Sequence, residues 1–455
     1  MTQTNEEIKI KFDPKDPAIL DMLAKSYQKR IVGEFDTIKF LISCYISKDL
    51  PRKYRLHTII ASQSSAGKSS IIRTVAEPFA EHLIDYTNFT PAFLKRQEGF
   101  MDGKILLLEQ LEKTNENNQA SMFDLKFLLS EGKIRVGITE KDDKGKFKPK
   151  TLEVLGIPVF ITTSTRMNID PETLNRTFLI QADESEEQTE RIIEYQLESY
   201  SSLLVNNDWK EELAHLTAFF EKYRQLAHQI KDIALPFGDK LKGKIPVENL
   251  TIRRDLPKIL SLTAVIAFIH SSNRHRIQYN EGENFITSSF GDTEKRFMYT
   301  ILAEPDDFKE ALQIAGVAIK QTLNKVNETS MKLYARIIEL YDSKTYATST
   351  LDGDGKVLGV TVKDVAEKTR KSENRTRELM AQLEHADYLI RDRSEKVHRF
   401  VPTGKKFTEI TIDDLTFSKV ELDEWILKQT ARHGQKITVI PPPSCNNLEN
   451  ENDTK

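Results

Sequence analysis

Gly67, Lys68 and Ser69 are the residues with the clearest chemical potential, because they end a loop of small residues between an apolar run and a helical pattern. This order is typical of a phosphate-binding loop, in which backbone N–H groups and a helix N-terminus converge on phosphates. Lys68 would reach the β- and γ-phosphates, and Ser69 would bind Mg²⁺. The sequence therefore predicts a site for ATP and Mg²⁺ formed by Ser64, Ser65, Ala66, Gly67, Lys68, Ser69 and Ser70.

The loop departs from the GxxxxGK[ST] pattern at its first position, where Ser62 replaces glycine. Serine enters the same turn with a less permissive backbone. A bare Gly-Lys-Ser/Thr tripeptide occurs by chance in roughly one chain in five of this length. The prediction of a nucleotide site therefore depends on the strand before the loop and the helix after it.

Glu109 and Gln110 follow the apolar run Ile105–Leu108 and lie at the end of a predicted strand. In P-loop ATPases an acidic residue here binds the Mg²⁺ shell, and the next carboxylate polarises the attacking water. Glu109 suits the first role, but Gln110 cannot act as a base because an amide has no protonation equilibrium near neutral pH. Three interpretations stay open: a natural variant helped by Glu112 or another residue, a naturally weak ATPase, or an engineered Glu→Gln trap. The alternative for the whole stretch is a buried strand that ends in solvated charges.

Two further segments contain polar residues suited to phosphate chemistry. Thr163 and Ser164 end the apolar run of PVFITTST, where they are candidates to bind the attacking water or the γ-phosphate. Arg176 precedes the next predicted strand, and an arginine at that place can act as a finger that stabilises charge at a neighbour's ATP. The alternative for Arg176 is a local ion pair with Asp170 or Glu172.

A predicted β-hairpin has arms at Ile134–Thr139 and Thr151–Leu155 and a strongly basic tip. The tip, KDDKGKFKPK, has five Lys and two Asp, so 5 − 2 gives a net charge of +3. Such lysines suit phosphate backbones, where each charge releases counterions without reading bases. The candidate DNA-binding residues are Lys144, Lys146, Lys148 and Lys150. The alternative is a solvated surface loop.

A second basic segment lies in a compact pattern of three helices and two short apolar runs over residues 330–402, which predicts a winged helix-turn-helix. Its KTRKSENRTR stretch carries a net charge of 5 − 1, or +4, at the start of the third helix. The N-terminal residues of that helix approach the major groove in helix-turn-helix domains. The candidate contacts are Arg370, Lys371, Arg375 and Arg377, with Arg391, Arg393, Lys396 and Arg399 on the wing. The alternative is a module for protein contacts or regulation.

The elements that position these residues alternate short β-rich runs with helical stretches between residues 57 and 182. That alternation is typical of a parallel sheet with helices on both faces, so the fold class is α/β. Residues 185–325 are predicted to be almost wholly helical, with loops near 236–246 and 280–295. The predicted parts are N-terminal helices (1–50), the α/β ATPase core (51–184), a helical lid (185–325), the winged-helix domain (326–405), and a C-terminal extension with a disordered tail (406–455).

Composition excludes several other classes of protein. The chain has 455 residues, and 66 basic against 69 acidic residues give a net charge of −3, so nucleic acid would be bound by local patches. Cys44 and Cys445 are the two cysteines, which excludes a disulfide framework or a Cys-rich zinc site. The polar start MTQTNEEIK lacks the apolar core of a signal peptide, and the longest apolar stretch is too short to span a bilayer. We expect a cytoplasmic protein.

The order of the motifs resembles AAA+ ATPases of the minichromosome maintenance (MCM) type. It more closely resembles the helicase half of primase–helicase proteins carried by phages, plasmids and other mobile elements. The matching pieces span about residues 30–275, and the family's winged helix extends the likeness to about residue 400. They are RIVGEFDTIKFLI, SSAGKSS, KILLLEQLE, LLSEGKIR, PVFITTST, LNRTFLIQADESEEQT and RRDLPKILSLTAVIAFIHSSNR.

The resemblance implies an AAA+ fold and a homohexamer with ATP bound between subunits. It implies that the lysine hairpin lies in the central channel on DNA, that Arg176 is the arginine finger, and that Arg254, rather than Arg253, is the second sensor. Ser62 and Gln110 depart from the family's pattern, and Gln110 puts the ATPase rate in doubt. A primase or polymerase would be a separate partner.

The function expected from the sequence is an ATP-dependent hexameric DNA helicase that acts in replication of a mobile element or virus. The main alternative is an AAA+ replication initiator or remodeller that binds ATP and duplex DNA without unwinding it, which Gln110 slightly favours. A third class, a non-enzymatic DNA-binding scaffold, leaves the order from P-loop to arginine finger unexplained.

Overall fold

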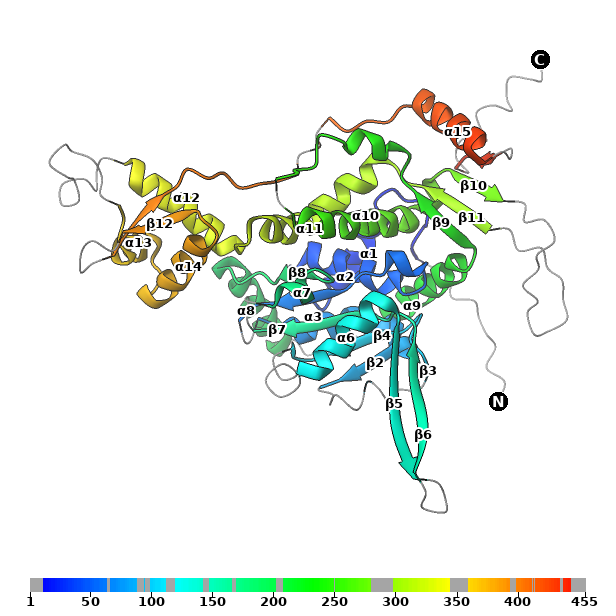
Figure 1. Ribbon diagram of the computed structural model, residues 1–455, viewed down its shortest axis with the longest axis horizontal. Coiled ribbons are helices and arrows are strands. Elements are labelled where there is room, and N and C mark those ends of the chain that lie inside the picture. The colour runs from blue at the N-terminus through cyan, green and yellow to red at the C-terminus, as the bar shows by residue number, and fades with distance from the viewer. Residues whose placement is uncertain are drawn as a thin grey trace. The chain divides into compact units, whose positions relative to one another are not determined.

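The computed structural model describes residues 11–63, 66–87, 94, 99–111, 119–141, 147–165, 169–201, 208–248, 250–279, 298–343, 359–392, 398–410, 412, 414–433 and 437–442. The chain divides into two compact units (Figure 1). The first unit contains Met1–Ile245, Arg253–Gly316 and Ile412–Lys455, and the second contains Pro246–Ile252 and Val317–Thr411. The finer division into five parts stays a prediction.

A parallel β-sheet forms the centre of the first unit. In the described part of the chain it has five strands in the order β2-β4-β7-β1-β8, each paired in parallel with its neighbour. Strands β1, β4 and β7 are buried along their whole length, which explains their continuous apolar runs. The strands are β1 (Thr58–Ala61), β2 (Leu83–Tyr86), β4 (Ile105–Leu108), β7 (Val159–Ser164) and β8 (Phe178–Gln181).

Helices pack on both faces of this sheet. On one face Leu125 and Leu128 of α6 (Gln119–Glu131) join a core cluster with Ile59 and Phe160 of the sheet. On the other face Phe40 packs edge-on against Phe178 with their ring centroids 4.9 Å apart. The helices beside the sheet are α1 (Ile19–Tyr27), α2 (Phe35–Ser47), η1 (Arg52–Tyr54), α3 (Lys68–Ala76), η2 (Glu77–His82), α7 (Pro171–Leu174), α8 (Glu186–Ser201) and α9 (Asp208–Ala227). This arrangement agrees with the expected α/β class.

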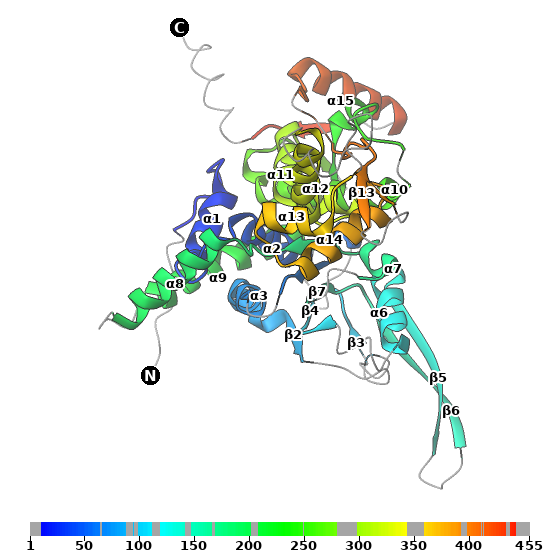
Figure 2. The ribbon, with the colours of Figure 1, turned by 90° about the vertical axis from the view of Figure 1, so that its left-hand side faces the viewer.

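A long antiparallel hairpin extends from one end of the sheet (Figure 2). Strands β5 (Lys133–Lys141) and β6 (Phe147–Leu155) pair over their full length, and the short β3 (Gly99–Phe100) pairs with the base of β6. Ile134 and Val154 anchor the base in the core shared with α6. The hairpin therefore forms where the sequence predicts it, with longer arms.

The prediction that residues 185–325 are almost wholly helical is wrong. Strands β9 (Ile230–Ala234), β10 (Arg276–Tyr279) and β11 (Met298–Leu302) form a four-stranded sheet with β14 (Thr438–Ile440) in the described ranges. Helices α9, α10 (Ile252–Ile269), α11 (Pro305–Asn324) and α15 (Lys419–His433) and the short η3 (Pro236–Leu241) and η4 (Ser271–Asn273) complete these segments. Strand β14 pairs antiparallel with β10, so part of the expected C-terminal extension is ordered. The tail IPPPSCNNLENENDTK was expected to be disordered, but its first residue, Ile440, ends β14, whereas residues 443–455 lie outside the described residues.

The second unit has three helices and a two-stranded antiparallel sheet in the order that the sequence predicts. They are α12 (Glu328–Asp342), α13 (Val362–Thr369), α14 (Glu373–His385), β12 (Leu389–Asp392) and β13 (Arg399–Pro402). Thr361 and Asp364 form a capping box at α13, and Ser372 caps α14 by accepting a hydrogen bond from Arg375 N. The capping box fixes the start of α13, and the Ser372 cap fixes the end of the turn that leads into α14. Among the described residues, no helix is both long and apolar enough to cross a membrane.

His57, at the start of β1, is expected to make stability depend on pH. Its buried Nδ1 accepts a hydrogen bond from Phe160 N at 3.1 Å, and burial, aided by nearby Arg55, lowers the pKa of His57 to about 3. Below pH 6.5 the unfolded chain binds a proton that the folded chain does not, so stability falls as the pH falls. The loss is about 1.4 kcal/mol per pH unit. Urea unfolding measures how much the free energy of unfolding falls between pH 7 and pH 5. This fall should be about 2 kcal/mol smaller in His57→Asn than in the unchanged chain, because the amide oxygen accepts the same hydrogen bond without titrating. Equal losses would contradict this assignment.

Candidate nucleotide-binding site

The loop between β1 and α3 is fixed at both of its ends. Ser62 N donates to Ser164 O at 3.2 Å, which extends the pairing of β1 with β7 by one residue. Gly67 then takes a left-handed conformation with φ 75° directly before α3, a conformation that a residue with a Cβ adopts at a cost. The α3 N-terminus thus follows the loop directly. Ser64 and Ser65 lie outside the described residues.

The Lys68 side chain folds back onto the loop that precedes α3. Its buried side chain donates from Nζ to Ser62 O at 2.8 Å and to Gln63 O at 2.6 Å. These carbonyls hold the charge against the loop, where the oxygens of a bound triphosphate would compete for it. The loop is also held by Glu184, whose Oε1 accepts from Gln63 N at 2.6 Å. Sequence reasoning did not identify Glu184, because a carboxylate 121 residues from Gln63 carries no local signal.

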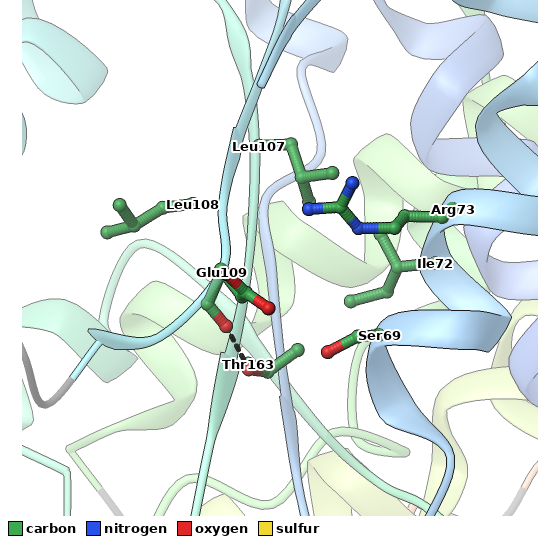
Figure 3. A pocket seen from close by; sticks show the side chains of 7 residues that line it. All are labelled: Ser69, Ile72, Arg73, Leu107, Leu108, Glu109 and Thr163. Carbon is green, nitrogen blue, oxygen red and sulfur yellow. Dashed lines mark hydrogen bonds between the residues drawn. The ribbon is translucent and has the colours of Figure 1, made fainter. Parts of the chain in front are cut away.

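Figure 3 shows a small pocket where the ends of β4 and β7 meet the start of α3. The Thr163 hydroxyl donates to the Glu109 carbonyl oxygen, which ties the two neighbouring strands together. The Ser69 hydroxyl and the Glu109 carboxylate lie on either side of the same space. The lining residues are Ser69, Ile72, Arg73, Leu107, Leu108, Glu109 and Thr163. Three of the residues singled out in the sequence therefore converge.

The donors in this pocket suit Mg²⁺. A hydroxyl and a carboxylate are hard oxygen ligands, and Mg²⁺ is usually held by one or two carboxylates together with substrate phosphates and waters. A cluster of three or more His, Cys, Asp or Glu residues is absent from the described ranges, so they offer no all-protein metal cage. Ser69 and Glu109 thus fit an ion that depends on a bound nucleotide.

Arg73 is a pocket residue that sequence reasoning missed. It lies one helical turn after Ser69 on α3, and its Nη1 binds Asp85 Oδ2 of β2 at 2.8 Å. The spacing of four residues from Ser69 was the available signal, because residues i and i+4 share a helix face. Ser70 follows on α3, and Ser164 is buried at the end of β7. Gln110 directly follows Glu109 and is half-buried.

Arg176 lies apart from this pocket, beside α6. Its Nε donates to Ser130 Oγ at 2.5 Å, and its Nη1 donates to Glu172 O at 2.7 Å. The carboxylates of Asp170 and Glu172 instead bind Lys126 Nζ, at 2.7 and 3.3 Å. Burial alone would raise the pKa of Asp170, but hydrogen bonds from Lys126 and Thr173 lower it. The sequence left open a local ion pair of Arg176 with Asp170 or Glu172. In the structure Lys126, rather than Arg176, forms the ion pairs with these two carboxylates.

Arg253 and Arg254 lie in the first turn of α10, and both are exposed. One turn later, Lys258 Nζ donates to Leu174 O at 3.0 Å and to Thr177 O at 3.1 Å, on either side of Arg176 in the sequence. Burial lowers the pKa of Lys258, although Asp255 beside it at 2.7 Å opposes the shift. The start of α10 is thus fixed to the segment that carries Arg176.

The basic residues predicted to bind DNA lie on two exposed elements. On β6, Lys148 and Lys150 are exposed and stand opposite Glu140 and Ile138 in the ladder, whereas Lys144 and Lys146 lie outside the described residues. In the second unit, Arg370 ends α13 in a left-handed conformation, and α14 begins shortly after it. The exposed or half-buried candidates there are Arg370, Lys371, Arg375 and Arg377.

In the predicted wing, Arg391 is held by two contacts. Arg391 hydrogen-bonds His398, and its guanidinium lies 5.6 Å from the centre of the Phe400 ring. Arg399 on β13 is half-buried, and Arg393 and Lys396 lie outside the described residues. Arg375 binds Glu378 at 3.1 Å, and Arg377 donates to Asn374.

Among the solved structures that match this chain are two with low sequence identity. One is a full-length MCM homologue from Methanopyrus kandleri, with 12% identity and a TM-score of 0.40 over 68% of this chain and 60% of that one. The other is the apo A form of the C-terminal region of NrS-1, with 12% identity and a TM-score of 0.28 over 89% of this chain and 79% of that one. The present chain thus spans less than two thirds of the length of the MCM homologue. No protein-family model and no curated protein sequence matches it.

Proposed function

We propose that this protein is an ATP-dependent, hexameric DNA helicase of the MCM-like AAA+ type. The observation that carries the proposal is the convergence of Ser69, Glu109 and Thr163 beside a phosphate-binding loop at the carboxyl ends of β1, β4 and β7. Strands β1 and β7 are neighbours in the sheet, but the chain continues from them in opposite directions. After β1 it goes to β2 at one edge of the sheet, and after β7 it goes to β8 at the other edge. Ligands of open α/β sheets bind at such a switch point.

In phosphoryl transfer, different residues of the loop and pocket would bind the phosphates, hold Mg²⁺ and orient the attacking water. Lys68 would exchange its bonds to the loop carbonyls for bonds to the β- and γ-phosphates, and the α3 N-terminus would add N–H groups. A Mg²⁺ ion held by Ser69 and Glu109 would neutralise charge on the phosphates. Thr163, fixed by its bond to the Glu109 carbonyl, and Ser164 would orient the attacking water. Gln110 has no carboxylate to take the proton, so hydrolysis would be slow unless Glu112 or another residue supplies the base.

The remaining negative charge at the γ-phosphate would be neutralised by an arginine from a second copy of this chain. Arg176, Arg253 and Arg254 do not line the pocket in the described part of the chain, and Lys258 joins their segments into one side of the unit. An arginine finger that acts on a neighbour's ATP requires this separation. ATP would therefore bind between subunits, with Arg176 as the finger and Arg254 as the second sensor.

DNA would be held by the hairpin and the second unit. Lys148 and Lys150 extend the basic surface along β6, and the start of α14 carries a second cluster of basic residues. Hydrolysis at successive interfaces would move the hairpins along one strand. A replication initiator that binds ATP and duplex DNA without unwinding is the second candidate, and Gln110 is the observation that favours it.

Nucleotide binding is the first step to test. Lys68→Ala is expected to weaken binding of a fluorescent ATP analogue at least about 100-fold, because a charge-assisted contact to two phosphates is lost. Ser69→Ala should lose the Mg²⁺ dependence of binding and keep Mg²⁺-independent binding. Lys25→Ala, on exposed α1 surface, is the control and should bind as the unchanged chain does. Unaltered binding in Lys68→Ala would contradict the assignment of the loop.

Single-stranded DNA binding tests the hairpin. The double variant Lys148→Ala and Lys150→Ala should bind an oligonucleotide more weakly and lower the slope of log K against log salt by about 1.4, since each single-strand contact contributes about 0.7. The matched control replaces Lys25 and Lys242, which are exposed on other elements. If both double variants lose the same slope, the hairpin has no special role.

A further inference from the structure

Among the apolar surfaces that the described residues of the first unit expose, two lie on faces of α6 and α8. The first, called here the α6 patch, consists of Phe123 and Phe127, whose rings stack with centroids 6.4 Å apart. Phe123 is 66% exposed although Leu125 and Leu128 on the opposite side of the same helix are fully buried. Contiguous exposed apolar side chains mark interaction sites.

The α6 patch is continuous with the arginine side of the unit. Phe127 and Ser130 are three residues apart on α6, so they share one helix face, and Ser130 Oγ accepts the hydrogen bond from Arg176 Nε. Lys126, on the same stripe, binds Asp170 and Glu172 next to Arg176. Any protein that covers Phe123 and Phe127 therefore also approaches Arg176.

The second surface, called the α8 stripe, consists of Ile193, Leu197 and Tyr200, which recur at i, i+4 and i+7 on one face of α8. Leu197 is 66% and Tyr200 is 92% exposed. The opposite face of α8 contacts the body of the unit, where Gln188 Nε2 donates to Val32 O and Tyr195 donates to Lys29 O. A helix whose inner face is held and whose outer face is apolar has a docking surface.

The α8 stripe belongs to the nucleotide side of the unit. Helix α8 begins two residues after Glu184, whose carboxylate holds Gln63 N in the phosphate-binding loop. Figure 2 shows α8 and the α6–α7 pair on opposite sides of the central sheet. The α6 patch thus lies on the side of the finger, and the α8 stripe lies on the helix that begins beside the nucleotide loop.

The charges around the two surfaces are complementary. Helix α8 has five Glu and one Arg, so its apolar stripe is surrounded by negative charge. The side with the α6 patch carries Arg176, Arg253 and Arg254, together with the exposed carboxylates of Glu131 and Glu172. An acidic rim disfavours nucleic acid on α8 and favours a basic partner. A head-to-tail contact between copies requires two different, complementary surfaces of this kind on one chain.

We propose that the α6 patch of one copy of this chain packs on the α8 stripe of the next copy, and that this contact places Arg176 at the neighbour's nucleotide. The inference rests on the proposed function for the identity of the shared site. The contact is heterologous, so repeating it closes a ring or forms a helical filament. Burial of Phe123, Phe127 and Tyr200 supplies the aromatic contacts that dominate interface energetics.

Two single variants test the contact by sedimentation velocity in ATP and Mg²⁺. Phe127→Glu removes the α6 patch and Leu197→Glu removes the α8 stripe, and both sites are exposed, so folding should be unaffected. Each variant alone should sediment as a monomer at concentrations where the unchanged chain is assembled, with the midpoint of assembly raised at least about 30-fold. Leu427→Glu on α15, 69% exposed, is the matched control and should assemble normally.

Mixing the two variants gives the sharpest result. Phe127→Glu keeps its α8 stripe and Leu197→Glu keeps its α6 patch, so an equimolar mixture should form a dimer and nothing larger. Assembly of either variant like the unchanged chain, a mixture that stays monomeric, or a monomeric unchanged chain would each overturn the proposal. A Phe127→Glu variant that assembles normally but binds single-stranded DNA more weakly would assign the α6 patch to nucleic acid instead. Sedimentation measures assembly and the fluorescent ATP analogue measures nucleotide binding, so a chain that binds the analogue without assembling overturns this contact and leaves the nucleotide site intact.

Discussion

Replacing Gln110 by Glu is expected to raise the ATP turnover of this chain by on the order of 100- to 10,000-fold, the usual contribution of a positioned general base. Gln110 directly follows Glu109, which lines the pocket beside Ser69. A carboxylate at position 110 can take a proton from the attacking water, whereas the amide cannot. Steady-state phosphate release with saturating ATP and Mg²⁺ measures the change.

Two controls make the Gln110 result specific. Gln110→Ala lacks a base as Gln110 does, so its turnover should stay near that of the unchanged chain. Combining Gln110→Glu with Lys68→Ala should remove the gain, because ATP is no longer held. Equal rates for the unchanged chain and Gln110→Glu would show that another residue supplies the base or that the site does not hydrolyse ATP.

Arg176→Ala, made together with Gln110→Glu, is expected to lower ATP turnover about 1,000-fold, the scale of a lost arginine finger. Binding of the ATP analogue should change little, because Arg176 is bonded to Ser130 and Glu172 and does not line the pocket. The matched control is Arg30→Ala, which removes a partly exposed arginine that pairs with Glu77. Single-turnover hydrolysis separates the chemical step from binding.

A mixing experiment shows whether Arg176 acts on a neighbouring subunit. Lys68→Ala and Arg176→Ala, both with Gln110→Glu, are inactive alone but have complementary defects. In an equimolar mixed ring about a quarter of the interfaces have an intact Lys68 on one side and an intact Arg176 on the other. Recovery of turnover on mixing is the expected result. Mixtures as inactive as their components would place Arg176 in its own subunit's site or outside catalysis.

The elements that the sequence predicted correctly are those with a strong local signal. The strand before Ser62, the helix after Gly67 and the apolar run before Glu109 each lie within a few residues of the chemistry they position. The sequence also predicts the hairpin arms, because two β-rich runs flank one turn-rich segment. In these cases periodicity and turn residues point to the same structure.

The elements that were missed depend on contacts between distant parts of the chain. Strand β14 has three residues and pairs with β10, from which it is separated by about 160 residues, and β9 pairs in parallel with β11. Strands this short are stabilised by their neighbours rather than by their own propensity. Glu184 was missed for the same reason, because its bond to Gln63 arises only when the end of β8 comes beside the loop.

Forked-DNA unwinding by Gln110→Glu, measured beside the unchanged chain and with single-stranded DNA added to parallel ATPase assays, decides whether this protein is a helicase. Gln110→Glu should hydrolyse ATP, single-stranded DNA should stimulate this hydrolysis, and the fork should be unwound only when ATP is present. The unchanged chain should bind ATP and DNA and unwind little. If both forms bind ATP and DNA but neither hydrolyses nor unwinds, the helicase proposal fails and an ATP-binding initiator or a scaffold takes its place.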